Sequence, residues 1–314
     1  MSGELWAATS YFNPCGYRSR RENYRVFRER LGVPLVTAEL SFDGKFELGE
    51  DEADVVVRVN GGSILWQKER LLNLAVAALP PRVEHVAMLD CDIVFDGPSW
   101  AERTHRLLRD HPLVQPFTKV YRIPPELCPP SALEWTRYVR TGFAAAQEVR
   151  LHGRIRGALG GAWAARRSLL QRHGLYDACI LGGGDDALTR AAFGDLQSTA
   201  ENLYMNPAQQ RHYRAWAEPF FAEVRGRVGF AKARIGLLWH GEYARRRYRD
   251  RHREMQRFGF DPGADIVHAE SGAWRWSGDK PAMHEYVARY FLDRREDTRD
   301  AADRLPRGGA ASPA

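Results

Sequence analysis

Two aspartates interrupt one of the most apolar stretches of the chain. Asp90 and Asp92 stand inside the run from His85 to Phe95 (HVAMLDCDIVF), which otherwise has the composition of a buried strand. Burying an unpaired carboxylate is costly, so two of them here indicate an exposed strand end or a bound cation. Side chains two residues apart on an extended segment point to the same side, so both carboxylates can face one divalent cation, which could hold a diphosphate. The alternative is that the two acids only cap the next turn.

A second pair of acids follows three consecutive glycines. The segment Leu181 to Leu188 (LGGGDDAL) places Asp185 and Asp186 directly after residues that have no side chain. Such glycines let a ligand approach the backbone closely, and the acids after them could reach into a cleft. The alternative is an N-cap alone, for a helix that starts near Ala187. The segment Gly157 to Trp163 (GALGGAW) is also dense in glycine and predicts another loop of this kind.

Alternating strands and helices would position these groups. The hydrophobic patterns predict strands at 5–11, 33–42, 53–59, 85–95 and 113–121, and helices that end at Leu31 or cover 64–79 and 100–110. This alternation favours an α/β fold with a mostly parallel sheet flanked by helices. Further helices are predicted at 132–139, 166–173, 208–233 and 245–257, and the tail from residue 294 is expected to be disordered.

The composition is that of a folded protein. With 314 residues, 44% hydrophobic and 27% charged, the chain fits one large domain or one domain with an elaboration. No apolar stretch reaches the ~20 residues that a membrane span requires, and no signal peptide precedes the first strand, so the sequence predicts a cytoplasmic protein. The four cysteines lie far apart, which argues against a disulfide framework or a zinc ribbon.

The acidic strand end resembles the DxD motif of the GT-A glycosyltransferases, which transfer a sugar from a nucleotide-diphosphate donor. In that family the motif ends a strand after a nucleotide-binding αβ half, and here three predicted strands and two helices precede it. The resemblance covers about Leu5 to Gly241. It implies a GT-A domain over 1–241, with a nucleotide-sugar half (1–122) and an acceptor half (123–241). A basic helical elaboration (242–293) and the disordered tail (294–314) would follow.

The same resemblance implies a metal site and a base. A divalent cation, Mn²⁺ or Mg²⁺, would be bound by Asp90 and Asp92 together with His240, because some relatives bring a histidine from the far end of the domain to the DxD motif. Asp186 would be the general base and Asp185 would hold the acceptor or the donor sugar, although the two roles could be exchanged. One-step displacement would invert the anomeric centre. A lone histidine is often structural, so His240 could instead be a residue of the fold alone.

The resemblance also implies which residues bind the donor, expected to be a UDP-linked hexose. They lie in the first strand and the loop after it, near the end of the second strand, at the helix before the DxD motif, at the motif itself and in the GALGGAW segment: Thr9, Tyr11, Asn13, Arg18, Glu39, Asp43, Lys68, Asp90, Gly160, Gly161 and Trp163. Arg20 and Arg21 are further candidates for the diphosphate. Trp163 could stack on a sugar face or belong to the core, and the basic residues could be solvated loop charges.

The distribution of positive charge along the chain suggests which kind of acceptor the protein would bind. The chain has a formal net charge of +6 and a pI near 9.2, and arginines interleaved with aromatic residues fill the stretch 245–257. On a helix, one face of this stretch could lie along a phosphate backbone through Arg245, Arg246, Arg249 and Arg253, or the arginines could pair internally with acids. A duplex DNA acceptor would present the hydroxyl of a hydroxymethylated pyrimidine, flipped out of the stack. The chain loosely resembles the phage and kinetoplastid enzymes that glycosylate such bases.

Two other functions remain open at the level of sequence. A glycosyltransferase could act on a polysaccharide, a glycolipid or a protein at the cytosolic face of a membrane, with the basic residues contacting anionic lipids. The chain could also be a non-catalytic nucleic-acid-binding protein whose acids are structural. The fold itself does not choose the acceptor.

Overall fold

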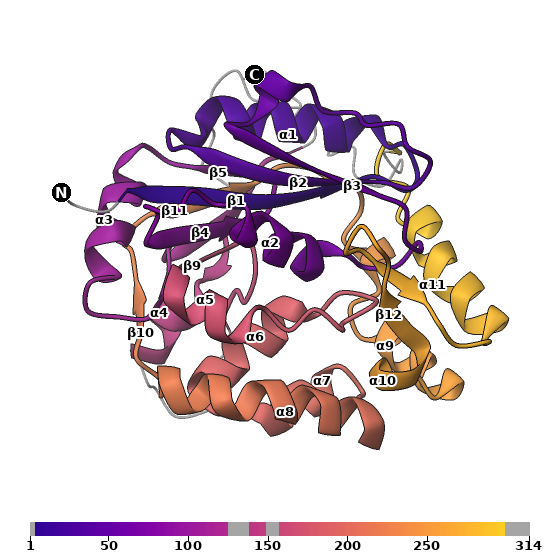
Figure 1. Cartoon of the computed structure of the whole chain (residues 1–314). Coiled ribbons are helices and arrows are strands. Elements are labelled where there is room, and N and C mark those ends of the chain that lie inside the picture. Colours follow the sequence, from indigo (N-terminus) through magenta and orange to yellow (C-terminus); the bar gives the residue numbers. More distant parts are fainter. Residues whose placement is uncertain (1–3, 125–137, 149–156, 299–314) are drawn as a thin grey trace, which may run out of the picture.

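The computed structural model describes residues 4–124, 138–148 and 157–298, and a seven-stranded sheet forms its centre (Figure 1). From edge to edge the strands are β10 (Val228–Phe230), β6 (Leu113–Gln115), β9 (Ala162–Arg166), β4 (His85–Leu89), β1 (Leu5–Phe12), β2 (Leu35–Ser41) and β3 (Val55–Asn60). Strands β1 to β4 are parallel to one another, whereas β9 is antiparallel to both of its neighbours. The predicted α/β fold with a mostly parallel sheet is confirmed.

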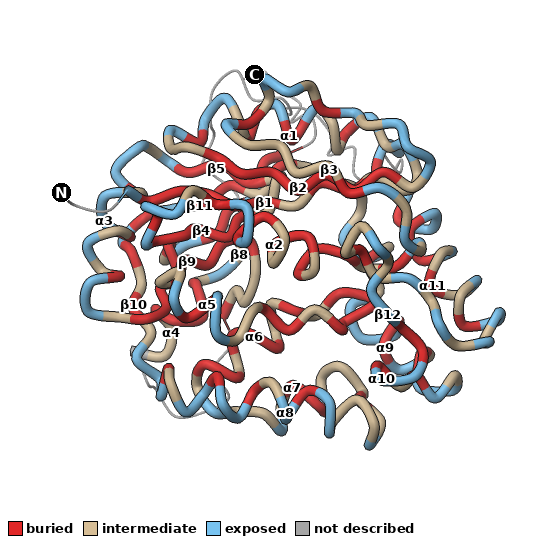
Figure 2. Tube along the Cα trace, in the orientation of Figure 1, coloured by how far each residue is buried: buried red, intermediate tan, exposed pale blue. Residues whose placement is uncertain are grey.

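Helices cover both faces of this sheet, which is why its central strands are largely apolar. Alternate side chains of β1 point to opposite faces. Leu5 packs with residues of α1 (Arg18–Leu31) in one hydrophobic cluster, and Trp6 packs with residues of α2 (Lys68–Ala77) in another. Figure 1 shows α1 and α2 on opposite sides of β1, and Figure 2 shows the central strands as a buried layer. A sheet buried on both faces needs continuous apolar strands, as the sequence pattern indicated.

The strand predicted over 85–95 is wrong as a single element. The chain leaves the sheet after Leu89, turns at residues 90–92 and enters β5 (Ile93–Phe95), which belongs to a second sheet of order β5, β11, β7, β8. The other strands of that sheet are β11 (Arg234–Leu237), β7 (Lys119–Arg122) and β8 (Tyr138–Thr141). Continuing β4 through two aspartates would bury both carboxylates inside the sheet, and the turn avoids that cost.

The strand predicted over 113–121 likewise divides into β6 and β7. Pro116 stands between them, and because proline has no N–H group it cannot continue the hydrogen-bond ladder of a central strand. In the helix predicted over 132–139, residues 132–137 lie outside the described residues, and 138–141 form β8 instead.

The helices that follow β5 pack around the sheet. They include α3 (Ser99–Leu107), α4 (Phe143–Glu148), α5 (Arg167–His173), α6 (Gly184–Phe193), α7 (Leu196–Asn202) and α8 (Pro207–Val224). The helix predicted over 208–233 therefore ends early. Arg225 and Gly226 have φ angles of 49° and 70°, a left-handed conformation that terminates a helix, and β10 follows.

The region after the second sheet is not one basic helix. The predicted helix over 245–257 consists of η3 (Ala244–Arg246), α9 (Asp250–Met255) and η4 (Gln256–Phe258), because Arg247 adopts a left-handed conformation with φ 45°. The hairpin of β12 (Ile266–His268) and β13 (Trp274–Trp276), which the sequence did not predict, lies between α10 (Pro262–Asp265) and α11 (Pro281–Asp293). The described residues contain no helix long and apolar enough to cross a membrane.

The first residues of the expected disordered tail are packed instead. Residues 294–298, called the C-terminal strap below, lie against the start of α1. Arg294 and Glu296 are 3% and 0% exposed. The carboxylate of Asp297 accepts hydrogen bonds from the backbone N–H groups of Arg18 and Ser19 at 2.9 and 2.8 Å, and so caps α1. The expectation of disorder from residue 294 is wrong for these five residues, and residues 299–314 lie outside the described part.

Candidate functional site

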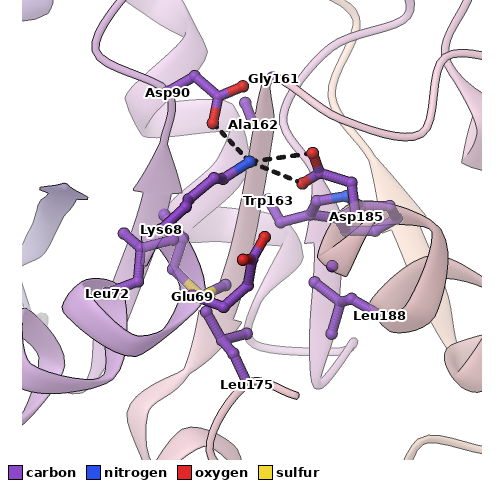
Figure 3. Close-up of a pocket in the computed structure, with 12 residues that line it drawn as sticks. Lys68, Glu69, Leu72, Asp90, Gly161, Ala162, Trp163, Leu175, Asp185 and Leu188 are labelled. Carbon is purple, nitrogen blue, oxygen red and sulfur yellow. Dashed lines mark hydrogen bonds and ion pairs between the residues drawn. The ribbon is translucent and has the colours of Figure 1, made fainter. Parts of the chain in front are cut away.

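Three charged side chains meet where β4 ends. Lys68 is the first residue of α2, Asp90 directly follows β4, and Asp185 lies in the first turn of α6. The Nζ atom of Lys68 lies 2.6 Å from Oδ1 of Asp90 and 2.9 and 3.0 Å from the two carboxylate oxygens of Asp185 (Figure 3). Burial alone would lower the pKa of Lys68, but these carboxylates hold it well above its ordinary value. The carboxyl end of a parallel sheet, where α/β proteins bind ligands, therefore carries a buried ammonium bridging two acids.

Two glycines make room for the acids of this site. A Cβ atom built on Gly160 would lie 2.4 Å from Oδ2 of Asp185, and one built on Gly184 would lie 2.2 Å from Oε1 of Glu69. Both distances are far shorter than a van der Waals contact, so a side chain at either position would have to displace a carboxyl group. The two glycine-dense segments of the sequence thus contribute empty space that carboxylates fill from neighbouring elements.

We expect Gly184→Ala to destabilise the fold by about 1–3 kcal/mol, because the new methyl group must displace the buried carboxyl group of Glu69. Gly97→Ala is the matched control, since a Cβ atom there meets no atom within 4 Å. It should change stability by less than about 0.5 kcal/mol. Urea unfolding followed by circular dichroism measures both values. Equal values for the two variants would show that Gly184 is not required for steric reasons.

Glu69 is a site residue that sequence reasoning missed. Its side chain lies at a cavity of about 20 Å³, room for one water molecule, which is also lined by Lys68, Asp90 and Asp185 (Figure 3). Burial raises the pKa of Glu69 to about 8, with Lys68 opposing the shift and Asp185 adding to it. Burial likewise raises the pKa of Asp90 to about 7, again opposed by Lys68. The signal was present, because Glu69 shares a helix face with the buried Leu72 at helical spacing, where an apolar residue is expected.

The raised pKa of Glu69 makes stability depend on pH. Between its ordinary pKa of 4.5 and its folded pKa of about 8, the folded chain keeps a proton that the unfolded chain loses. The free energy of unfolding must therefore fall as pH rises from 5 to 8, by about 1.4 kcal/mol or less for each pH unit. Glu69→Gln removes this contribution. We expect the variant to gain stability relative to the wild type as pH rises, measured by urea unfolding at pH 5, 6.5 and 8, and a constant difference would contradict it.

A second pair of residues lies on the other side of the turn after β4. Nδ1 of His240 lies 2.8 Å from Oδ2 of Asp92. The second sheet produces this contact, because β11 pairs antiparallel with β5 and the backbone N–H of Leu238 donates to the carbonyl oxygen of Asp92 at 2.8 Å. The sequence predicted that His240 would approach the DxD motif, and the structure brings the two together.

The chemistry of this pair fits a divalent cation. Burial lowers the pKa of His240, with Arg246 adding to the effect and Asp92 opposing it, which favours the neutral imidazole. Burial would raise the pKa of Asp92, but His240 and Arg246 bring it well below its ordinary value. Nδ1 of His240 is buried and makes no well-aligned hydrogen bond despite its closeness to Asp92. A neutral imidazole nitrogen beside an ionised carboxylate is a donor set that manganese and zinc accept.

The three expected metal ligands do not converge. Asp90 contacts Lys68 whereas Asp92 contacts His240, because residues 90–92 form a turn and the alternation of an extended strand does not apply to them. Within residues 4–124, 138–148 and 157–298, no three His, Cys, Asp or Glu side chains are arranged to hold a metal ion. The structure thus brings Asp92 and His240 together, and a cation shared by Asp90, Asp92 and His240 stays a prediction.

The two acids of α6 lie in different surroundings. The side chain of Asp186 is only 12% exposed. Its Oδ2 atom accepts hydrogen bonds from Arg190 at 3.1 Å and Asn202 at 3.3 Å. Burial raises its pKa, with Arg190 opposing the shift. Asp185 is the acid that faces the cavity, with its side chain 34% exposed. The first turn of a helix points successive residues in different directions, so only one of two adjacent acids can face the site.

Several residues expected to contact the donor are buried in the fold. The hydroxyl of Thr9 donates to the carbonyl oxygen of Leu89 at 2.7 Å, and Nε1 of Trp163 donates to the carbonyl oxygen of Leu159 at 2.7 Å. A central strand covered on both faces leaves these side chains no access to solvent. Side chains buried in this way, with exposed fractions of 0–2%, are Thr9, Tyr11, Glu39 and Trp163. Trp163 nevertheless lines the cavity beside Lys68 and Asp185 (Figure 3), and the donor contacts expected of these four residues stay predictions.

The other expected donor residues remain candidates. Asn13 is partly exposed, and Arg18 and Asp43 are exposed. Gly161 lines the cavity beside Asp90, and its φ of +98° favours glycine.

The arginines expected to contact nucleic acid do not share one exposed face. Arg246 is buried and donates to the carbonyl oxygen of His240 at 2.7 Å, while Arg253 donates to Asp250 at 2.8 Å. Arg249 is exposed, and Arg245 is partly buried. The broken helix is the reason, since Arg247 redirects the chain between them. The described stretch thus lacks the continuous basic face that was expected.

No protein-family model and no curated protein matches this sequence. Among solved structures, the chain is similar to the catalytic domain of Drosophila beta1,4galactosyltransferase 7 in complex with xylobiose, with 11% identity, a TM-score of 0.37 and coverage of 90% of this chain and 98% of that one. It is similar to GalNAc-T7 with UDP, GalNAc and Mn²⁺, with 12% identity, a TM-score of 0.40 and coverage of 91% and 55%. It is also similar to 4-diphosphocytidyl-2C-methyl-D-erythritol synthase from Anaerococcus prevotii, with 11% identity, a TM-score of 0.36 and coverage of 78% and 91%.

Proposed function

We propose that this chain is a glycosyltransferase that cleaves a nucleotide-diphosphate sugar and transfers the sugar to an acceptor hydroxyl. The observation that supports this most strongly is the 2.8 Å contact between Asp92 and His240 beside the Lys68 and Asp185 pair. Both pairs lie at the carboxyl end of a parallel sheet, the edge at which α/β proteins bind nucleotides. One pair is suited to the diphosphate and the other to the acceptor.

Asp92 and His240 would hold a divalent cation, Mn²⁺ or Mg²⁺. When bound, the cation supplies a Lewis acid for the negative charge that develops on the departing diphosphate. The neutral imidazole leaves a lone pair free for the cation, and the carboxylate is already ionised. Asp90 takes no part in this set, because Lys68 neutralises it.

Asp185 would accept the proton of the acceptor hydroxyl as that oxygen attacks the anomeric carbon. Its carboxylate is the more accessible of the two acids in α6, and its ion pair with Lys68 fixes its orientation. Attack in a single displacement, with the diphosphate leaving from the opposite face, inverts the anomeric centre. Glu69, protonated at pH 7, would keep a second negative charge out of the cavity.

The proposal is tested with a panel of nucleotide sugars. The full chain is incubated with Mn²⁺ and UDP-, GDP-, CDP- or dTDP-linked hexoses, and the released nucleoside diphosphate is measured. We expect one donor, a UDP-hexose, to be hydrolysed or transferred in a reaction that EDTA stops. If no donor is cleaved and none binds in calorimetry, the chain is not a glycosyltransferase.

The acceptor is identified in the same reaction by mass. Candidate acceptors are duplex DNA with hydroxymethylcytosine or hydroxymethyluracil, a polysaccharide, a glycolipid and a peptide. Arg249 remains exposed for a phosphate backbone, which keeps DNA among them. A gain of one hexose in a digested nucleoside would identify DNA, and a gain in any other acceptor would exclude that assignment.

A further inference from the structure

A fully buried carboxylate lies among three arginines next to the proposed cation site. Glu296, in the C-terminal strap, is 0% exposed. Its carboxylate lies 2.6 Å from the guanidinium of Arg20, 2.6 Å from that of Arg294 and 3.6 Å from that of Arg246. The three arginines come from α1, η3 and the strap. They converge only in the folded chain, so no local sequence pattern marks them.

Among the described residues, the cluster carries more positive than negative charge. Three guanidiniums face the carboxylate of Glu296, and two of them, Arg20 and Arg246, also act on the ionised carboxylate of Asp92. Nε and Nη1 of Arg294 are buried and make no hydrogen bond, although the residue is only 3% exposed. Burial, together with Arg246, lowers the pKa of Arg294 to about 10. Buried donors without partners are costly, so the cluster is built for more anionic oxygens than Glu296 supplies.

The cluster adjoins the place where the proposed function puts a diphosphate. Arg246 donates to the carbonyl oxygen of His240 at 2.7 Å, and Arg20 donates to that of Phe12 at 2.9 Å, at the end of β1. Asp297 meanwhile occupies the N-terminus of the 14-residue helix α1, which is itself a favourable place for an anion. The strap therefore sets two carboxylates against two groups that typically bind phosphate.

We propose that Arg20, Arg246 and Arg294 form a diphosphate-binding site and that Glu296 fills it when no diphosphate is bound. The identity of the anion rests on the proposed function. The diphosphate replaces the carboxylate of Glu296 by rotation of that side chain, while the strap stays in place. Two contacts anchor the strap independently of Glu296, namely the cap that Asp297 gives α1 and the hydrogen bond from the backbone N–H of Arg295 to the hydroxyl of Tyr17 at 3.1 Å. Glu296 thus competes with the donor.

Inorganic pyrophosphate tests the site without a nucleotide or a metal. Calorimetry in EDTA compares the full-length wild type with Glu296→Gln, which keeps the shape of the side chain and removes its charge. We expect Glu296→Gln to bind pyrophosphate about 10-fold to 100-fold more tightly, since the competing charge-assisted contacts are gone. Asp293→Asn is the matched control, because it removes the negative charge of an exposed acid three residues before Glu296 and leaves both anchoring contacts of the strap in place, and it should leave the affinity unchanged.

Further variants cover the case in which Glu296→Gln folds poorly. If it unfolds at a lower temperature, pyrophosphate must raise that temperature more than it does for the wild type. Arg294→Met, which keeps Glu296 paired with Arg20, must weaken pyrophosphate binding. The inference is overturned if Glu296→Gln gains no affinity, or if the gain persists when Arg246→Met is added.

The two proposals fail separately. If Glu296→Gln binds pyrophosphate more tightly but no nucleotide sugar is cleaved, the proposed anion site is supported and the proposed glycosyltransferase activity is contradicted. If donor cleavage depends on Asp92 but Glu296→Gln leaves the pyrophosphate affinity unchanged, the proposed glycosyltransferase activity is supported and the proposed competition by Glu296 is contradicted.

Discussion

Asp92→Ala should abolish metal-dependent cleavage of the donor, with a fall in rate of about 1,000-fold or more. The cation is proposed to neutralise charge on the departing diphosphate, a contribution of several kcal/mol, and each 1.36 kcal/mol lost slows the reaction about tenfold. Mn²⁺ affinity should fall with it, because Asp92 is the only ionised carboxylate that contacts His240 among the described residues. Manganese binding by electron paramagnetic resonance and donor cleavage measure the two effects.

Asp90→Asn is the matched control for this variant. Asp90 stands two residues away on the same turn but contacts Lys68, 2.6 Å from its carboxylate, rather than His240. We therefore expect Asp90→Asn to keep most of its Mn²⁺ affinity, and His240→Ala to lose it as Asp92→Ala does. If Asp90→Asn loses Mn²⁺ binding as fully as Asp92→Ala, then both acids share the cation as the sequence pattern suggested, and the divergent turn opens when the metal binds.

Local patterns were sufficient to predict the framework of the site. The apolar strands before Asp90 and the helices between them specify a parallel sheet, and an acidic pair at the end of such a strand marks its functional edge. The approach of His240 to this edge was predicted from family resemblance and not from periodicity. Nothing local pairs β11 with β5, because contacts between distant strands depend on the whole fold.

Local sequence patterns did not predict the direction in which individual side chains of the site point. Which of Asp185 and Asp186 faces the cavity depends on where α6 begins, and helix starts are uncertain by a residue or two. The ion pair of Lys68 with two acids needs three elements in their final places. Residues in a turn do not alternate as in a strand, so Asp90 contacts Lys68 whereas Asp92 contacts His240.

The C-terminal strap shows that amino-acid composition, too, can fail to predict which residues are ordered. A charged tail after the last helix reads as disordered, since it has too few apolar residues to form a core of its own. Its first residues are held by ion pairs, with Glu296 inserted among arginines from α1 and η3. Charge complementarity between segments far apart in sequence leaves no trace in local hydropathy.

Asp185→Asn and Asp186→Asn should separate catalysis from stability. We expect Asp185→Asn to lower kcat by about 100-fold to 10,000-fold, the range that general bases contribute, while binding of UDP is preserved because the proposed cation site is intact. Asp186→Asn should keep its kcat within a few-fold. It should cost roughly 1–3 kcal/mol in the free energy of unfolding, since the amide weakens the contacts with Arg190 and Asn202.

Steady-state kinetics and urea unfolding of the two variants give opposite patterns if Asp185 is the base. The two variants make the same chemical change at adjacent residues. They therefore differ only in where the side chain lies, since the carboxylate of Asp185 faces the cavity and that of Asp186 faces α7. The reverse pattern, a large fall in kcat for Asp186→Asn alone, would restore the assignment that the sequence first favoured. It would also require α6 to rotate at its start when the donor binds, since Arg190 now holds Asp186 away from the site.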